Sequence, residues 1–128
     1  MPFDAPYQTP FGDIELLTDA RNRISNRKSW VQRRFQNGGR HCLVAALSLA
    51  CGSRSFRAPN RVERRLTRLI AMQIPRDAPF LIRYRLMPAR QRLISLNDDP
   101  RTTHKDVMAL FDRTISHLAS MAPISVPA

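Results

Sequence analysis

The sequence predicts an all-α fold, a compact single-domain bundle of about five helices around a buried central helix at residues 41–51. The chain has 128 residues, of which 43% are hydrophobic, and this suffices for one domain with its own core. The central segment contains only two polar residues, His41 and Ser48. A helix that is apolar on all sides is typical of a core, and the flanking segments repeat apolar residues at a helical period.

The N-terminal part of the chain predicts a lead-in, a helix and a break. Residues 1–12 contain three prolines and are expected to be extended. Residues 13–26 carry apolar residues near the helical period and acids toward the N-terminal end, which predicts a helix. Trp30 follows in a short helix or turn, and Asn37-Gly38-Gly39 interrupts the chain before the central helix.

The next helix has clear start and stop signals. Gly52 fits the position after the end of the central helix. Asn60 is a good N-cap, and Glu63 three residues later completes a capping box. This helix is predicted to run to about residue 74, because Pro75 stops it.

The C-terminal part predicts two more helices. Residues 79–87 alternate apolar and basic side chains as a strand does, but an extended loop or a helical turn competes because no partner strand is evident. Pro88 fits the first turn of a short helix that ends near Leu96. Thr103 caps the last helix, and residues 122–128 form a flexible tail.

Charge is the most informative feature for function. Between Arg21 and Arg92 the chain has 18 Arg or Lys and two acids, Glu63 and Asp77, so this stretch carries a net charge of +16. The chain as a whole carries +11. Such a field attracts polyanions and makes association strongly dependent on salt. Most of the basic residues are Arg, whose planar fork binds carboxylate and phosphate.

The main candidate binding surface is the arginine-bearing side of the helix that begins at Asn60. The primary hypothesis is that the chain is a non-enzymatic accessory or regulatory protein that binds an acidic protein partner through this surface. The alternative is binding of a nucleic-acid backbone without sequence preference, with Trp30 or Phe35 adding stacking. A solvated face, with Arg favoured by codon usage, is the competing interpretation. The candidate residues are Arg33, Arg34, Arg54, Arg57, Arg61, Arg64, Arg65 and Arg68.

A thiol hydrolase is a third and weaker hypothesis. Cys42 lies near a helix N-terminus, a position that lowers the pKa of a thiol and favours the thiolate. His104 or His117, with Asn97 or Asp98, would supply the other groups of such a site. A packed core cysteine is the competing interpretation.

No cofactor or metal site is predicted. Asp98, Asp99, His104 and Asp106 are dense enough to suggest a metal ion, but their spacing matches no ligand loop. Turn and capping roles explain them better. If Cys42 and Cys51 share a helix, they lie about 13 Å apart along its axis, which rules out a disulfide.

The sequence indicates a soluble, cytoplasmic protein. The longest apolar run, Cys42–Leu47, is too short to span a bilayer, and residues 1–13 do not resemble a signal peptide. No membrane partner is expected. The oligomeric state is left open by the sequence.

Three pieces of the chain carry a resemblance. They are Trp30, the block of residues 40–47, and the Asn-Asp turn at residues 96–103 that leads into a Thr-capped helix. Together they resemble a family of small bacterial and phage proteins known only as a domain of unknown function.

The resemblance covers roughly residues 13–119. The family pattern has a Gly where this chain has Ala45, and an aromatic residue where it has Leu96. A larger residue at position 45 would loosen the closest helix–helix approach. The resemblance implies a fold and no chemistry.

Overall fold

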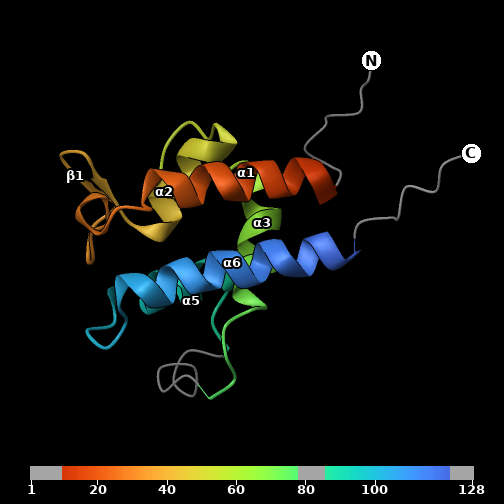
Figure 1. Cartoon of the computed structure of the whole chain (residues 1–128). Coiled ribbons are helices and arrows are strands. Elements are labelled where there is room, and N and C mark those ends of the chain that lie inside the picture. Colours follow the sequence, from red (N-terminus) through yellow and green to blue (C-terminus); the bar gives the residue numbers. More distant parts are fainter. Residues whose placement is uncertain (1–9, 78–85, 122–128) are drawn as a thin grey trace, which may run out of the picture.

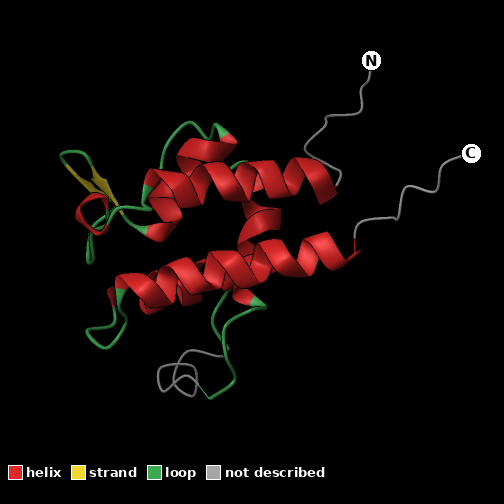
Figure 2. Ribbon diagram, in the orientation of Figure 1, coloured by secondary structure: helices red, strands yellow, loops and turns green. Residues whose placement is uncertain are grey.

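Five α-helices and one small antiparallel hairpin make up most of the computed structural model, which describes residues 10–77 and 86–121 (Figures 1 and 2). The all-α prediction is confirmed. The helices are α1 (Pro10–Arg23), α2 (Leu43–Cys51), α3 (Arg61–Ala71), α5 (Ala89–Asp98) and α6 (His104–Met121), with a short 3-10 helix, η2 (Arg27–Ser29), and strands β1 (Gln36–Asn37) and β2 (Arg40–His41).

The two longest helices form one side of the bundle. Figure 1 shows α1 and α6 lying alongside each other, with α3 behind them and the hairpin at one end. Helix α2 packs against α1, α3 and α5, while α6 packs mainly on α1 and α3. The third large helix contact of the central helix is therefore with α5.

The central helix is the core of the bundle. All six residues from Leu43 to Ser48 are buried, each no more than 1% exposed. The predicted central helix is thus confirmed, with two corrections at its ends. His41 lies in β2, and Cys42 is the N-cap. The last turn reaches the surface, because Leu49 is 37% exposed.

The hairpin explains why the helix starts later than predicted. Gln36 pairs with His41, and Asn37 pairs with Arg40. The two-residue Gly-Gly loop reverses the chain, and Gly38 has φ = 63°, a conformation that favours glycine. Asn-Gly and Gly-Gly loops are known hairpin signals, so the interruption at residues 37–39 contained this information.

Asn60 caps α3 as predicted, but Glu63 does not complete the capping box. The Asn60 side-chain oxygen accepts the Glu63 backbone N–H at 2.9 Å. The fully buried Glu63 carboxylate turns inward and accepts hydrogen bonds from Ser48 at 2.7 Å and Ser53 at 2.6 Å. The Ser53 hydroxyl oxygen in turn accepts the Asn60 N–H. The reciprocal bond of the box is replaced by one through Ser53, which frees Glu63 to join α3 to α2.

The capping of α6 is reciprocal. The Thr103 hydroxyl accepts the Asp106 N–H at 3.1 Å, and the Asp106 carboxylate accepts the Thr103 N–H at 2.9 Å. The predicted Thr103 cap is confirmed. Since the Asp106 carboxylate is engaged at the helix end, it serves capping as the sequence suggested.

Several predicted boundaries shift. Helix α1 begins at Pro10, so the expected lead-in is shorter than 1–12, and α5 runs two residues beyond Leu96. Most of the 79–87 segment and the 122–128 tail lie outside the described residues. Proline suits the first helical position because its missing N–H has no intrahelical partner there.

The buried position of Leu47 gives a stability prediction. Leu47→Ala should lower the free energy of unfolding by about 2–5 kcal/mol, because it leaves a cavity in a fully buried site. Leu49→Ala, the same change on the exposed end of the same helix, should cost about 1 kcal/mol or less. Urea denaturation of both variants is the measurement, and equal losses would contradict the assignment of the core.

Candidate functional site

A single buried side chain, Asn97, joins three segments of the chain. Its Oδ1 atom accepts the indole N–H of Trp30 at 2.7 Å and the backbone N–H of Leu43 at 3.1 Å. Its Nδ2 atom donates to the Val31 carbonyl at 3.0 Å and to Asp98 Oδ1 at 3.0 Å. Asn97 is fully buried at the end of α5, so this one amide connects α5, the N-terminus of α2 and the 30–31 segment.

Neighbouring residues extend this connection, which we call the Asn97 network. The Gln32 amide donates to the carbonyls of Asn97 and Asp99, both at 2.9 Å. The Asp98 carboxylate accepts the backbone N–H of Arg33 at 2.7 Å. Arg33 has φ = 71°, an uncommon conformation for a residue with a side chain. The 30–33 segment is thus held by hydrogen bonds from α5.

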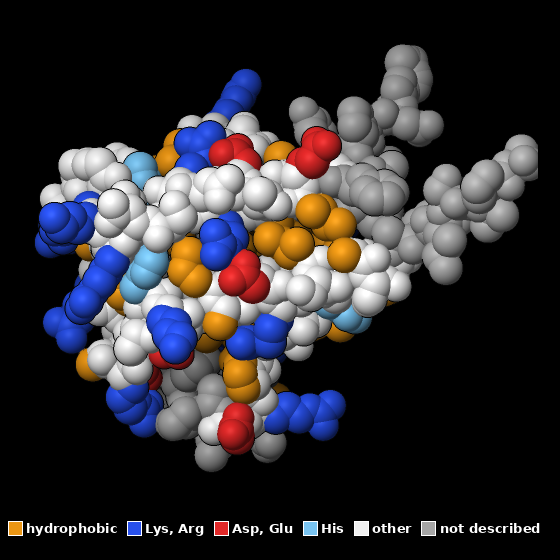
Figure 3. Space-filling view, in the orientation of Figure 1, with side chains coloured by type: hydrophobic (Ala, Val, Ile, Leu, Met, Phe, Trp, Pro, Cys, Tyr) orange, Lys and Arg blue, Asp and Glu red, His pale blue; other side chains and the backbone are white. Residues whose placement is uncertain are grey.

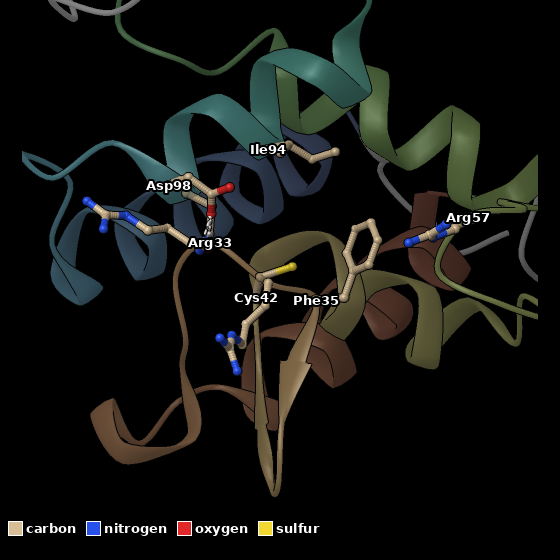
Figure 4. Close-up of a pocket in the computed structure, with 8 residues that line it drawn as sticks. Arg33, Phe35, Cys42, Arg57, Ile94 and Asp98 are labelled. Carbon is tan, nitrogen blue, oxygen red and sulfur yellow. Dashed lines mark hydrogen bonds between the residues drawn. The ribbon is translucent and has the colours of Figure 1, made fainter.

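A pocket of about 360 Å³ lies beside the network (Figure 4). Figure 4 shows the Cys42 thiol directed toward Phe35, with Ile94 above it and Arg57 reaching in from another loop. We call this the Cys42 pocket. It is lined by Arg33, Arg34, Phe35, Cys42, Arg57, Ile94, Asn97 and Asp98.

One wall of the Cys42 pocket is aromatic and already packed. The rings of Phe35 and Phe56 meet at 5.6 Å between centroids. The Arg90 guanidinium lies 5.5 Å from the centroid of Phe35 and donates to the Phe56 carbonyl. Trp30 has other partners: its N–H binds Asn97 and its ring contacts His104.

A second pocket, of about 520 Å³, lies between α3 and α5. Four arginines line it, two from each helix, together with apolar side chains. Arg90 belongs to this pocket and also covers Phe35 of the first, so the two pockets adjoin. The second pocket is lined by Pro59, Arg64, Thr67, Arg68, Met72, Met87, Pro88, Ala89, Arg90 and Arg92.

Most of the predicted arginines lie at the surface. The Cys42 pocket brings together Arg33 and Arg34 from one loop with Arg57 from another, and the second pocket brings in Arg64 and Arg68. We call the exposed set the Arg-rich face. Its seven members are Arg33, Arg34, Arg54, Arg57, Arg61, Arg64 and Arg68.

Arg65 is the exception among the eight predicted residues. Its guanidinium pairs with the Asp13 carboxylate of α1 at 2.5 Å, and the side chain of Asp13 is only 8% exposed. The sequence placed Arg65 on the solvent side, and this position is wrong. A buried carboxylate without a partner would destabilise the fold. Arg65 therefore stabilises the contact between α1 and α3 by pairing with Asp13.

The structure also brings in residues that the sequence did not single out. Arg90 and Arg92 line the second pocket, and Ile94 lines the first. Both arginines belong to the strongly basic stretch, which was the available signal. Because they are two residues apart on a short helix, no helical spacing marked them as part of a face.

On the face drawn in Figure 3, basic side chains are more frequent toward the hairpin end. Figure 3 shows acids and bases interspersed along α1 and α6, with more Lys and Arg toward the hairpin end. Two of the ion pairs on this side are Arg21 with Asp112 at 2.6 Å and Arg23 with Asp19 at 3.1 Å. Charges on the α1–α6 side are therefore partly balanced.

The geometry at Cys42 does not favour a thiolate. Its Sγ atom accepts the Ala45 N–H at 3.3 Å, as an N-cap does. Burial nevertheless raises the pKa of the Cys42 thiol, because the effect of desolvation is larger than the lowering of the pKa by the backbone N–H groups at the helix N-terminus. His104 binds the Ile24 carbonyl at 2.6 Å, and the described residues that line the Cys42 pocket include no histidine. The expected lowering of this pKa is wrong.

The acids near the last turn have protein partners. The Asp99 carboxylate accepts hydrogen bonds from the side chain and the backbone of Arg101, which lowers the pKa of Asp99 to about 2. Within residues 10–77 and 86–121, no three His, Cys, Asp or Glu side chains gather as a metal site requires. None of the described helices has the length and apolar character to cross a bilayer.

The Asn97 network gives a second stability prediction. Asn97→Ala should lower the free energy of unfolding by about 2–4 kcal/mol, because it removes the acceptor of the part-buried Trp30 N–H and of the buried Leu43 N–H. Asn22→Ala, at an exposed position of α1, should change it by about 0.5 kcal/mol or less. Thermal and urea unfolding compare the two. An Asn97→Ala protein as stable as the control would show that the network is dispensable.

The thiols give a prediction for pH. Burial raises the pKa of Cys51 to about 12 and raises that of Cys42, so both keep their protons at neutral pH. Iodoacetamide should therefore alkylate the native protein much more slowly than the urea-unfolded protein, with rates still rising above pH 9. A Cys51→Ser variant reports Cys42 alone. Rapid alkylation of that variant at pH 7 would restore the nucleophile hypothesis.

Comparison with known proteins identifies the family. Residues 9–117 match the family model DUF6197, described as a family of unknown function. This range contains both pockets and the whole Asn97 network. No curated protein and no solved structure matches the chain. The match agrees with the resemblance seen in the sequence: the chain belongs to DUF6197, a family of unknown function.

Proposed function

We propose that this protein is a non-enzymatic binding protein that takes up an acidic protein partner through its Arg-rich face. One observation carries the proposal. Among the described residues, the arginines that form ion pairs are Arg21, Arg23, Arg65 and Arg101, and no carboxylate pairs with any of the seven members of the face. Seven exposed cations that form no ion pair among the described residues are available to an external anion.

The pockets favour a protein over a nucleic acid. Both pockets combine Arg with apolar side chains, such as Ile94 in the first and Met72 in the second. Protein interfaces typically pair an apolar core with Arg-rich surroundings. Single-stranded nucleic acids need free aromatic faces for their bases, yet Phe35 is already covered by Phe56 and Arg90.

Backbone binding of nucleic acid remains the alternative, supported by the net charge of +11. This alternative predicts that the binding affinity falls steeply with salt concentration and depends little on the nucleic-acid sequence. An acidic protein partner predicts that a carboxylate-rich probe binds at least as well as DNA at the same charge. The two hypotheses are separated by the choice of probe.

The test is a pair of charge reversals on α3. Arg61→Glu with Arg68→Glu should weaken binding of a fluorescent Asp/Glu peptide about tenfold or more, because both residues are exposed and unpaired. Lys105→Glu with Arg113→Glu, at exposed positions of α6, makes the same change in net charge. This control pair should have a much smaller effect. Fluorescence anisotropy at several salt concentrations is the measurement.

Two results would count against the proposal. Equal weakening by both pairs would show that only net charge matters and that the face is merely solvated. The second result is that the protein binds a DNA duplex or single strand much more tightly than the peptide, and that the Arg61→Glu, Arg68→Glu variant loses this DNA binding. It would favour a nucleic-acid partner. Arg65 is left unchanged in the test because it pairs with Asp13.

A further inference from the structure

The Cys42 pocket has an apolar interior that opens on the Arg-rich face. Phe35 and Ile94 are half-buried, and Cys42 is 4% exposed. A protonated thiol behaves as a small apolar group. The volume of about 360 Å³ is at the low end for ligand pockets, so it suits one large side chain or a small molecule.

The walls of the pocket are fixed before any partner arrives. The Cys42 N–H donates to the Phe35 carbonyl at 2.9 Å, which holds these two residues together at the end of the hairpin. Asn97 fixes the start of α2 relative to α5, which carries Ile94. A cavity with rigid walls cannot collapse, and a preformed site lowers the ordering cost of binding.

The rim of the pocket is charged and mostly basic. Arg33, Arg34 and Arg57 are exposed, and none of them pairs with an acid among the described residues. Asp98 is the one carboxylate among the described lining residues, and its hydrogen bonds from Arg33 and Asn97 both reach Oδ1. Its Oδ2 atom is thereby left to accept an N–H from a bound backbone.

We infer that the Cys42 pocket seats one apolar side chain of the acidic partner, while flanking acidic residues of that partner bind Arg34 and Arg57. The inference rests on the proposed function and adds the chemistry of the recognised segment: acidic residues on both sides of an aromatic or branched apolar residue. The arginines alone attract any acidic chain. The pocket selects those with an apolar residue in register.

The experiment uses short synthetic peptides with random Asp and Glu on both sides of one central residue. The full-length protein should bind the Phe-centred peptides about tenfold or more tightly than the Ala-centred ones, measured by fluorescence anisotropy. Ile94→Trp, which fills the pocket, should abolish this preference. Ile115→Trp, the same change at a half-buried position of α6, should keep it.

A second variant covers the case in which Ile94→Trp does not fold. Ile94→Ala enlarges the pocket and should shift the preference from Phe-centred toward Trp-centred peptides. An unchanged preference in Ile94→Ala would overturn the inference. The double variant Arg34→Glu with Arg57→Glu should weaken the binding of Phe-centred and Ala-centred peptides by the same factor, because both peptide sets carry the same acidic flanking residues.

The outcomes separate the pocket from the face. If Phe-centred and Ala-centred peptides bind equally and both lose affinity in Arg61→Glu with Arg68→Glu, the pocket inference fails and the proposed function stands. If no peptide binds at low salt, both fail. If phenylpropionate competes for the pocket more tightly than any peptide binds, the pocket takes a small apolar acid, and the inference is overturned.

Discussion

The side-chain amide of Asn97 is the contact on which the rest of this structure depends. A buried amide must satisfy its donors and its acceptor, and here the partners lie on two other segments: Trp30 and Val31 on one, and Leu43 at the start of α2. The pieces of sequence that carried the family resemblance are the pieces that meet at this amide. The short motifs therefore have one structural role in common: together they hold the 30–33 segment and the start of α2 against the end of α5.

The candidate site follows from that joint. Because Asn97 fixes α5 against the start of α2, Ile94 and Cys42 face each other across a space that no described side chain fills. The adjoining loops bring arginines to the edge of this space. Two of the described acids are used elsewhere: Asp13 pairs with Arg65, and Glu63 is buried against Ser48 and Ser53. Among the described residues, the Arg-rich face is left without carboxylate partners.

Local signals in the sequence predicted much of the fold, and long-range contacts explain what they missed. Asn60 and Thr103 marked helix starts because capping is decided within four residues. Asn97 was interpreted as a turn residue, since turn chemistry suits Asn and nothing nearby in sequence reveals Trp30 as its partner. Arg61 and Arg65 lie four residues apart on one side of the helix, and only the position of Asp13 on α1 distinguishes them. The pockets combine residues up to about 65 positions apart in sequence, which periodicity cannot detect.

The most direct test of this account is hydrogen exchange at the indole N–H of Trp30, the one tryptophan of the chain. If the Asn97 amide is the central joint, this N–H should exchange only when the protein unfolds globally. Its protection should then match that of the Leu43 and Leu47 amides in α2. NMR measurements over a range of low urea concentrations would compare the three. Rapid, urea-independent exchange of the Trp30 N–H while α2 remains protected would contradict the account, because the 30–33 segment would then open independently of the core.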